Sequence, residues 1–350
     1  MAAADQYELN SPPFDSISSV RFSPSNPSLL FVSSWDTTVR LYDVDANEQK
    51  SKYDHRAAVL ACCFNNDSTK GYSGGLDTGV RELDLATEKI THLGQHANTV
   101  STMNYSKEHN VLITGSWDQT IRFWDPRTPS NSPSSSDPAC STTKYDLPER
   151  IYTMDLVNHT LVVAMASRLF NIYDIRKMVP GGSGGNGEVQ SRESSLKFMT
   201  RALACMVDGQ GYATASVEGR IAVEYFDPSP EAQEKKYAFK CHRQTVGDVD
   251  HVWPVNSLAF HPIYNTFASA GSDGTVSIWD HKLKKRLRQY PKYATAVPSI
   301  SFSSDGTKLA VGVSYNWDDG EEGMKQNAER PSVWIRRVGD EVKPKGWTGS

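Results

Sequence analysis

The sequence predicts an all-β protein, a single ring of seven four-stranded sheets of the β-propeller type, and three observations support this prediction. Similar segments end at Asp43, Asp84 and Asp125, at intervals of 41 residues, and another ends at Asp280. Apolar residues within these units alternate with a period of two, as in half-buried strands. Four short strands fit into about 41 residues, which is typical of one propeller blade.

The elements can be followed in order along the chain. A seventh unit begins at PSISFSSDG and ends near SVWIRRV, with Trp334, but contains only three visible strands. We expect the N-terminal segment DQYELN to supply the fourth strand and close the ring, so that residues 1–350 form one domain. The first six units close at Asp43, Asp84, Asp125, Asp174, Asp227 and Asp280.

The composition limits the possible partners. The chain has 37 Lys and Arg against 41 Asp and Glu, a formal net charge of −4, so direct binding to nucleic acid is not expected. No apolar run approaches the ~18 residues of a membrane span, and the N-terminus lacks signal-peptide features. The five cysteines form no CxxC pair. We therefore expect a reducing compartment, no disulfide framework, no zinc or other metal site and no cofactor.

Three stretches are expected to be flexible insertions between strands. Residues 127–145 are rich in Ser and Pro, and residues 180–188 are rich in Gly. Residues 316–331 form an acidic stretch within the last unit.

The repeat resembles the WD40 family. Asp36, Asp77, Asp118 and Asp273 each stand seven residues before the closing aspartate of their unit. In WD40 repeats a His, a Ser or Thr, this turn Asp and a Trp form a buried hydrogen-bonded tetrad. The resemblance implies a structural role, because a buried carboxylate needs hydrogen-bond partners. The residues assigned this role are His55, Asp77, His96, Asp118, Trp124, Asp273 and Trp279.

Longer sequence segments resemble one particular group within this family. FVSSWDTTVRLYDV, TGSWDQTIRFWDPRTP, EGRIAVEYFDPSPE and KKYAFKCHR resemble the spindle-assembly-checkpoint propeller of the Bub group, over about residues 7–315. The resemblance implies a non-enzymatic mitotic adaptor that is monomeric by itself and lies in the nucleus, and at kinetochores in mitosis. Its implied partners are GLEBS segments of a checkpoint kinase and a kinase-like protein, phosphorylated MELT motifs of the outer-kinetochore scaffold, and the mitotic checkpoint complex that inhibits a ubiquitin ligase.

The GLEBS site is expected around two tryptophans. Trp35 and Trp117 directly precede turn aspartates, outside the tetrad position, and an exposed Trp is a favoured interface anchor. By resemblance, Lys197 and Arg201 in RESSLKFMTR pair with acidic residues of the GLEBS segment, to which Arg offers a planar fork.

A phosphate site is expected in the fifth unit. Glu218, Gly219 and Arg220 stand where other units carry the turn aspartate, and Lys236 and Lys240 lie in the KKYAFK segment that follows. A cationic cluster of this kind suits a phosphothreonine. The resemblance implies that Arg220 and Lys240 contact the phosphate of the MELT motif.

Other functions remain as alternatives. The related mRNA-export propeller of the Rae and Gle type also binds a GLEBS segment, of a nucleoporin, but should carry a more basic surface. A generic peptide-binding propeller, such as a ubiquitin-ligase adaptor, is a third candidate. An enzyme is not expected, because the sequence contains no GxSxG, HExxH or P-loop motif.

Overall fold

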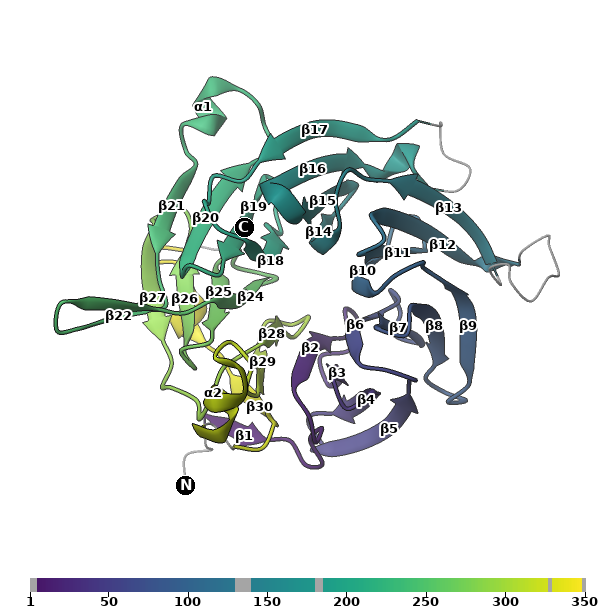
Figure 1. The fold of residues 1–350 in the computed structure, drawn as a ribbon, viewed down its shortest axis with the longest axis horizontal. Helices are drawn as coiled ribbons and strands as arrows, with labels where there is room; N and C mark the ends of the chain where they lie inside the picture. Colours follow the sequence, from purple (N-terminus) through teal and green to yellow (C-terminus); the bar gives the residue numbers. More distant parts are fainter. Residues whose placement is uncertain (1–4, 130–139, 180–184, 327–328, 348–350) are drawn as a thin grey trace.

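The computed structural model describes residues 5–129, 140–179, 185–326 and 329–347. In this part of the chain, seven four-stranded antiparallel sheets surround a central opening (Figure 1). We number these blades in chain order. Blade 1 contains β2 (Ile17–Phe22), β3 (Leu29–Ser34), β4 (Thr38–Asp43) and β5 (Glu48–Asp54); blade 2, β6 (Val59–Phe64), β7 (Lys70–Gly75), β8 (Gly79–Asp84) and β9 (Ile90–Gln95); blade 3, β10 (Val100–Ser106), β11 (Val111–Ser116), β12 (Thr120–Pro129) and β13 (Cys140–Asp146); and blade 4, β14 (Ile151–Val157), β15 (Thr160–Met165), β16 (Leu169–Asp174) and β17 (Glu188–Glu193).

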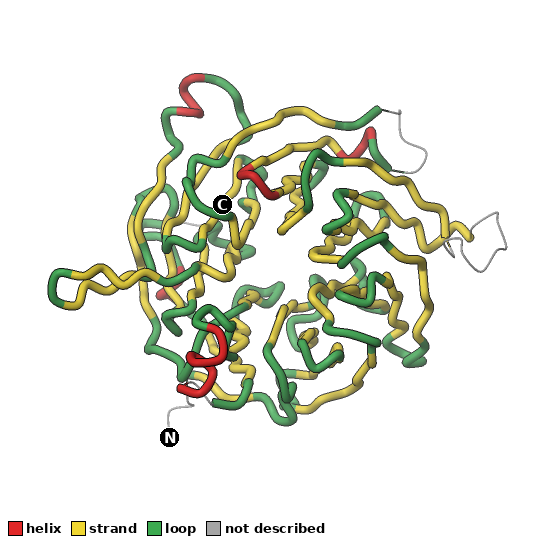
Figure 2. Tube along the Cα trace, in the orientation of Figure 1, coloured by secondary structure: helices red, strands yellow, loops and turns green. Residues whose placement is uncertain are grey.

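Helices are few and short (Figure 2), and none of those described is long and apolar enough to cross a membrane. They are α1 (Pro230–Gln233), α2 (Gly320–Gln326) and the 3-10 turns Ala166–Arg168, Ile175–Lys177 and Asp340–Val342.

Blade 5 contains β18 (Thr200–Cys205), β19 (Gly211–Ser216), β20 (Arg220–Tyr225) and β21 (Tyr237–Lys240), and a separate hairpin of β22 (Arg243–Val246) and β23 (Val249–Val252) follows it. Blade 6 contains β24 (Val255–Phe260), β25 (Phe267–Gly271), β26 (Val276–Asp280) and β27 (Lys285–Gln289). Blade 7 contains β28 (Ser299–Phe302), β29 (Lys308–Val313), β30 (Ser332–Arg337) and β1 (Gln6–Glu8).

The alternation of residues explains how the blades pack. The first strand of each blade borders the opening, and the fourth lies at the periphery (Figure 1). A second strand has a partner on each edge and a neighbouring blade on each face, so its side chains are buried throughout, as in β11 and β19. A fourth strand such as β5 alternates buried with less buried residues over most of its length. The predicted seven-bladed all-β propeller is confirmed.

The ring closes through the N-terminal strand, as predicted. β1 pairs antiparallel with β30 and becomes the fourth strand of blade 7. Immediately after it, the amide of Leu9 donates to the carbonyl of Val333 at 2.8 Å, and the Leu9 side chain is buried in a core cluster shared with blade 1. The Tyr7 hydroxyl donates to the carbonyl of Val44 at 2.6 Å. The N-terminal segment therefore connects blade 7 to blade 1 and closes the ring.

The predicted insertions have different boundaries in the structure. Residues 127–145 include the end of β12 and most of β13, which begins at Cys140 with a buried side chain. Only residues 130–139 of that stretch lie outside the described part. The stretch 180–188 reaches into β17, and the stretch 316–331 contains α2. The composition of this long window averages a Ser- and Pro-rich sequence with the residues of β13, so it does not show where the strand begins.

Buried tetrads fix the turns between second and third strands. In blade 3, His96 contacts Asp118 through Nδ1 at 3.0 Å and Thr114 through Nε2 at 2.8 Å, while the Trp124 indole donates to the same Thr114 hydroxyl at 2.8 Å. Burial alone would raise the pKa of Asp118, but hydrogen bonds from His96 and Thr120 hold it well below its usual value. The tetrad thus keeps a largely buried carboxylate ionised.

Blade 2 lacks the tryptophan of this tetrad, whereas blade 6 has all four members. In blade 2, His55 contacts Ser73 at 2.8 Å and Asp77 at 3.3 Å, but Leu83 stands in the tryptophan position. Blade 6 has a complete tetrad, in which Trp279 and His242 both bond Ser269, and His242 lies 2.9 Å from Asp273.

The buried tetrad histidines predict an acid-sensitive fold. Burial lowers the pKa of His55 and His96 below 6.5, so near this pH the folded chain holds fewer protons on these two histidines than the unfolded chain does. The unfolded state therefore binds more protons, and stability falls as pH falls. From pH 7.5 to 5.5 we expect the free energy of unfolding to drop by about 1 kcal/mol for each histidine.

Urea denaturation at the two pH values measures this change. A His96→Phe variant is less stable at both values but should lose one histidine's share of the pH dependence. Equal pH dependence in the variant and the natural chain would contradict this assignment.

Candidate functional site

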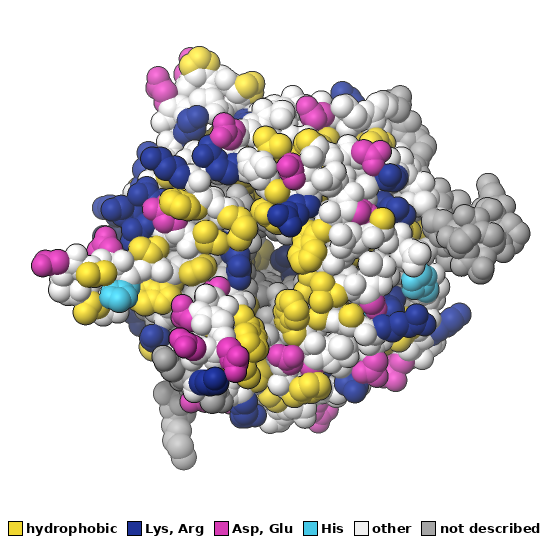
Figure 3. All heavy atoms as spheres, in the orientation of Figure 1, with side chains coloured by type: hydrophobic (Ala, Val, Ile, Leu, Met, Phe, Trp, Pro, Cys, Tyr) yellow, Lys and Arg dark blue, Asp and Glu magenta, His cyan; other side chains and the backbone are white. Residues whose placement is uncertain are grey.

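One end of the ring collects the exposed apolar side chains. Turns between second and third strands and connections between blades lie at this end, because the strands of a blade run alternately in opposite directions. We call it the α2 face, since α2 lies in the β29–β30 connection. Figure 3 shows hydrophobic side chains gathered around the central opening on this face. The large exposed apolar residues of these turns and connections include Phe14, Trp35, Trp117, Phe198, Met199 and Trp317.

The two predicted anchor tryptophans occupy equivalent turns of blades 1 and 3. The side chains of Trp35 and Trp117 are 47% and 37% exposed. The amide of Trp35 donates to a backbone carbonyl in the connection that precedes its own blade, at 2.9 Å. The amide of Trp117 donates to a carbonyl in the equivalent connection of its blade, at 3.0 Å, so both backbones are fixed. Leu76, half-buried, holds the same position in blade 2. Three neighbouring blades therefore present a row of apolar side chains, Trp35, Leu76 and Trp117.

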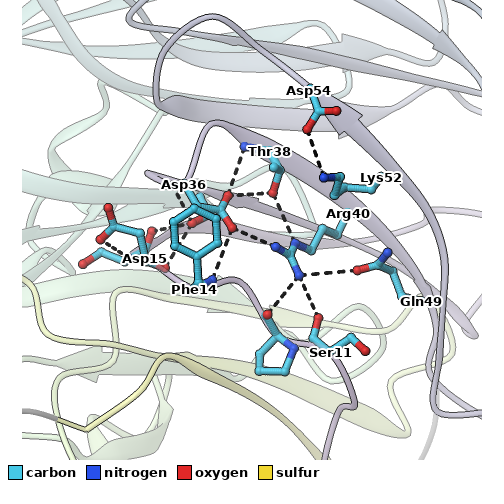
Figure 4. A network of polar contacts seen from close by, with 12 residues as sticks. Ser11, Phe14, Asp15, Asp36, Thr38, Arg40, Gln49, Lys52 and Asp54 are labelled. Carbon is cyan, nitrogen blue, oxygen red and sulfur yellow. Dashed lines mark hydrogen bonds and ion pairs between the residues drawn. The ribbon is translucent and has the colours of Figure 1, made fainter.

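A polar network around Asp36, the residue that follows Trp35, holds the loop of Phe14 (Figure 4). The carboxylate of Asp36 accepts from Arg40 at 2.9 Å and from the amide of Phe14 at 3.3 Å. Arg40 also donates to the carbonyls of Ser11 and Pro12, both at 2.9 Å. Blade 1 thus uses an arginine where blade 3 uses a histidine, and the same carboxylate holds the Trp35 turn and the loop of Phe14.

Arg201 lies at the start of β18, where two cavities meet. It lines a narrow central channel of about 170 Å³ and a cleft of about 610 Å³ that also contains Trp253 and Tyr315. Its Nη2 lies 3.9 Å from Asp318, which belongs to the acidic insertion and accepts a hydrogen bond from Ser272. The side chain remains 31% exposed and open to a further acidic partner.

The other two basic residues of the RESSLKFMTR segment, Lys197 and Arg192, lie in different environments. Lys197 is exposed in the β17–β18 connection, beside the exposed Phe198 and Met199. Arg192, in β17, instead donates to the carbonyl of Tyr225 at 2.9 Å and lies 3.7 Å from Glu224. Arg192 therefore joins blades 4 and 5, whereas Lys197 faces solvent.

Arg220 and Lys240 are brought together at the α2 end of blade 5. They lie opposite each other on β20 and β21. The Arg220 Nε lies 3.3 Å from Glu218 but makes no hydrogen bond, although this atom is buried. Arg243, at the base of the β22–β23 hairpin, donates to the carbonyl of Glu218 at 2.8 Å. Blade 5 has given up its tetrad, and the hydroxyl of Thr214, equivalent to that of Thr114, has no hydrogen-bond partner.

The third cation predicted for the phosphate site, Lys236, lies at the other end of β21 from Lys240. Lys236 precedes β21, whose first residue, Tyr237, lies opposite Val223, whereas Lys240 ends the strand. Four residues of extended chain separate the two lysines by about 13 Å. Lys235, its neighbour, lines a separate cleft of about 630 Å³ with Lys282 and Lys284.

Sequence reasoning missed the role of His242, which belongs to the tetrad of blade 6. It lies 38 residues before Asp280, whereas His55 and His96 lie 29 residues before their closing aspartates. The β22–β23 hairpin directly after it, which projects from the ring in Figure 1, accounts for the longer interval. Allowing an insertion in the spacing would have found it.

The chemistry of this surface is that of binding. Burial raises the pKa of the cysteine thiols, to about 11 for Cys62, so that they remain protonated and unreactive. His55, His96 and His242 are committed to buried contacts in their blades. The α2 face offers instead apolar anchors, Arg201 beside a cleft and a pair of opposed cations.

Comparisons with known proteins agree with the observed fold and indicate the family of the chain. The family model "WD domain, G-beta repeat" matches residues 6–43, 87–125 and 234–280. Among solved structures, the "Crystal structure of RRP9 WD40 repeats" superposes with a TM-score of 0.73 over 97% of this chain and 98% of that one. The sequence identity is 16%, so this likeness concerns the fold alone.

Curated relatives cover nearly the whole chain. "Mitotic checkpoint protein BUB3.1" of Arabidopsis thaliana is 49% identical over 97% of this chain and 94% of its own length. "Mitotic checkpoint protein bub3" of Dictyostelium discoideum is 43% identical over 90% and 91%, respectively. "mRNA export factor GLE2" of Chaetomium thermophilum is 36% identical over 97% and 92%.

Proposed function

The chain belongs to the WD40-repeat family of the Bub3 mitotic checkpoint proteins, to which the Gle2 and Rae1 mRNA-export proteins are related, and we propose that it is a non-enzymatic adaptor of that checkpoint. In this proposal its α2 face binds GLEBS segments of a checkpoint kinase and a kinase-like protein. A separate site in blade 5 binds phosphorylated MELT motifs and so recruits these partners to kinetochores. The observation that carries the proposal is the row of exposed apolar side chains beside Arg201 on one face.

The GLEBS part of the proposal follows from the shape and chemistry of this face. Trp35, Leu76 and Trp117 repeat at equivalent turns of adjacent blades, which suits an extended segment that crosses several blades. Rigid aromatic anchors lose little conformational entropy on binding and dominate interface energies. Arg201, beside its cleft, offers a charged contact for an acidic side chain of the segment.

The phosphate part rests on Arg220 and Lys240. Their opposed positions bring two cations to one end of blade 5, and the buried Nε of Arg220 lacks a hydrogen-bond acceptor. A phosphothreonine supplies three strong acceptor oxygens and nearly two negative charges. Glu218, 3.3 Å from Arg220, partly neutralises this cation, so a bound phosphate competes with that carboxylate for Arg220.

The setting of the adaptor is part of the same proposal. We infer a nuclear protein that lies at kinetochores in mitosis, is monomeric by itself and enters the mitotic checkpoint complex. Relatives named as mitotic checkpoint proteins, at 49% and 43% identity, support this setting.

A role in mRNA export is the second candidate. Relatives named for RNA export are 36% and 38% identical to the chain, which supports descent from a common propeller but favours the checkpoint group. The GLEBS protein that copurifies with the chain from mitotic cells distinguishes the two roles. A checkpoint kinase supports the proposal, and a nucleoporin alone contradicts it.

Truncating an anchor tryptophan should weaken GLEBS binding without unfolding the ring. We expect Trp35→Ala and Trp117→Ala each to cost about 2–4 kcal/mol, or roughly 30- to 1000-fold in Kd, measured by calorimetric titration of a GLEBS peptide. Leu283→Ala, which removes an exposed apolar side chain from the other end of the ring, serves as the control. Natural affinity in both tryptophan variants would contradict the proposed site.

Arg201 and Asp318 should act in opposite directions. Arg201→Ala should weaken the GLEBS complex by about 2–5 kcal/mol, because it leaves a partner carboxylate desolvated and unpaired. Asp318→Asn removes a competing carboxylate 3.9 Å from Arg201 and should tighten binding by roughly 2- to 5-fold. Glu321→Gln, in the same insertion but paired with Lys325, should change nothing. A lower melting temperature for Arg201→Ala with unchanged affinity would make Arg201 a scaffold residue.

Phosphate discrimination should depend on Arg220. The natural chain should prefer a phosphorylated MELT peptide over the plain peptide, because each charge-assisted hydrogen bond contributes about 1.5–3 kcal/mol. Arg220→Ala should remove most of this preference, measured by fluorescence anisotropy, while GLEBS binding persists. Lys236→Ala is the matched control, since Lys236 lies at the other end of the strand region and should leave the preference intact. Equal affinity of the natural chain for both peptides would contradict the phosphate site.

A further inference from the structure

Three metal-ligating side chains meet across the joint between blades 3 and 4. Glu108 and His109 lie in the turn between β10 and β11, and His159 lies in the turn between β14 and β15. Both are turns between first and second strands, so they lie at the end of the ring opposite the α2 face. Nδ1 of His159 is 2.7 Å from Oε2 of Glu108 and 3.3 Å from Nε2 of His109. Among the residues that the structure describes, this is the only such group of three whose ligand atoms lie within 4.8 Å of one another.

The distances match tetrahedral zinc coordination. Zn²⁺ binds imidazole nitrogen at about 2.0–2.1 Å, which places two ligands of a tetrahedron roughly 3.3 Å apart. The two imidazole nitrogens have this separation. The carboxylate is closer, but the Glu108 side chain is 41% exposed and needs only a small rotation to reach the same separation.

Hydrogen bonding alone does not satisfy this group. Nδ1 of His159 carries either a proton or a lone pair. As a donor it bonds Glu108 at 2.7 Å, and any sharing of that proton with Nε2 of His109, at 3.3 Å, gives only a weak second contact. As an acceptor it can bond His109, but then it directs a lone pair at the carboxylate. A cation between the three atoms stabilises all three contacts at once.

The backbones that carry the ligands are already tied down. The carbonyl of His109 accepts from Arg127 at 3.2 Å, and the carbonyl of His159 accepts from the amide of Ile175 at 2.9 Å. Because both turns are held, metal binding requires little ordering of the chain.

We propose that Glu108, His109 and His159 form a zinc site that joins blades 3 and 4. Two histidines and one glutamate are a common zinc ligand set, with the fourth position left to water. The side chains of His159 and Glu108 are 36% and 41% exposed, so the ion can enter from solvent without opening a blade. Bound zinc links two blades that otherwise meet through packing and hydrogen bonds, and it stabilises the ring.

The experiment uses the untagged full-length chain after removal of metals with a chelator. Zn²⁺ at about 100 times its dissociation constant should raise the melting temperature by about 3 °C and bind with a stoichiometry of one. Co²⁺ should give the visible absorption of tetrahedral coordination. Mg²⁺ should have no effect, because it prefers an octahedron of oxygen ligands. Absence of stoichiometric zinc binding would overturn the proposal.

Variants locate the site. His159→Asn should remove both the melting-temperature shift and the Co²⁺ spectrum, and Glu108→Gln, which lies on an exposed turn and preserves the fold, should weaken zinc binding. His92→Asn in blade 2 and His251→Asn in the β22–β23 hairpin remove histidines elsewhere in the chain and should leave binding unchanged. Zinc binding that survives in His159→Asn, or that is lost in His251→Asn, would place the ion elsewhere and overturn the assignment.

Discussion

The cost of burying a carboxylate governs the architecture of the ring. Each regular blade places an aspartate in the turn between its second and third strands, and that group is stable there only with hydrogen-bond donors. His96 and Thr120 supply them in blade 3, and the contact of His96 with Thr114 extends the network to Trp124. The network fixes the turn relative to the blade's own core. Whatever side chain precedes the aspartate is therefore held at the α2 face.

The proposed binding surface is built from variations on this unit. In blade 1, Arg40 takes the place of the histidine and, through Asp36, also holds the loop of Phe14 beside Trp35. In blade 5 the aspartate is replaced, Thr214 loses its partners, and Arg220 begins the third strand. The ring tolerates such irregular blades because neighbouring blades and the N-terminal strand keep the sheet edges closed. The proposed binding functions are thus concentrated where the repeat departs from its own pattern.

The two ends of the ring serve different purposes in this account. The α2 face carries the apolar row, Arg201 with its cleft, and the Arg220–Lys240 pair, and all of these belong to turns or strand ends of the same kind. The opposite end carries the Glu108, His109 and His159 group and the lysine-lined cleft near Lys235. Since the two ends are separated by the length of the strands, a metal at one end can stabilise the ring without entering the peptide site at the other.

The sequence by itself determined the repeat and its strands, because period-two alternation and regular spacing are local properties. The missing fourth strand of the last unit also pointed to the segment DQYELN as the one that closes the ring. The sequence also singled out Trp35 and Trp117, since both stand outside the tetrad position. It did not reveal the tetrad role of His242, because an inserted hairpin shifts the spacing. It grouped Lys236 with Lys240, which lie at opposite ends of β21. Only the tertiary structure decided which side chains meet across blades, as Arg201 does with Asp318 and His109 with His159. Such pairs are far apart in sequence, and no local pattern records them; they arise from the closure of the ring.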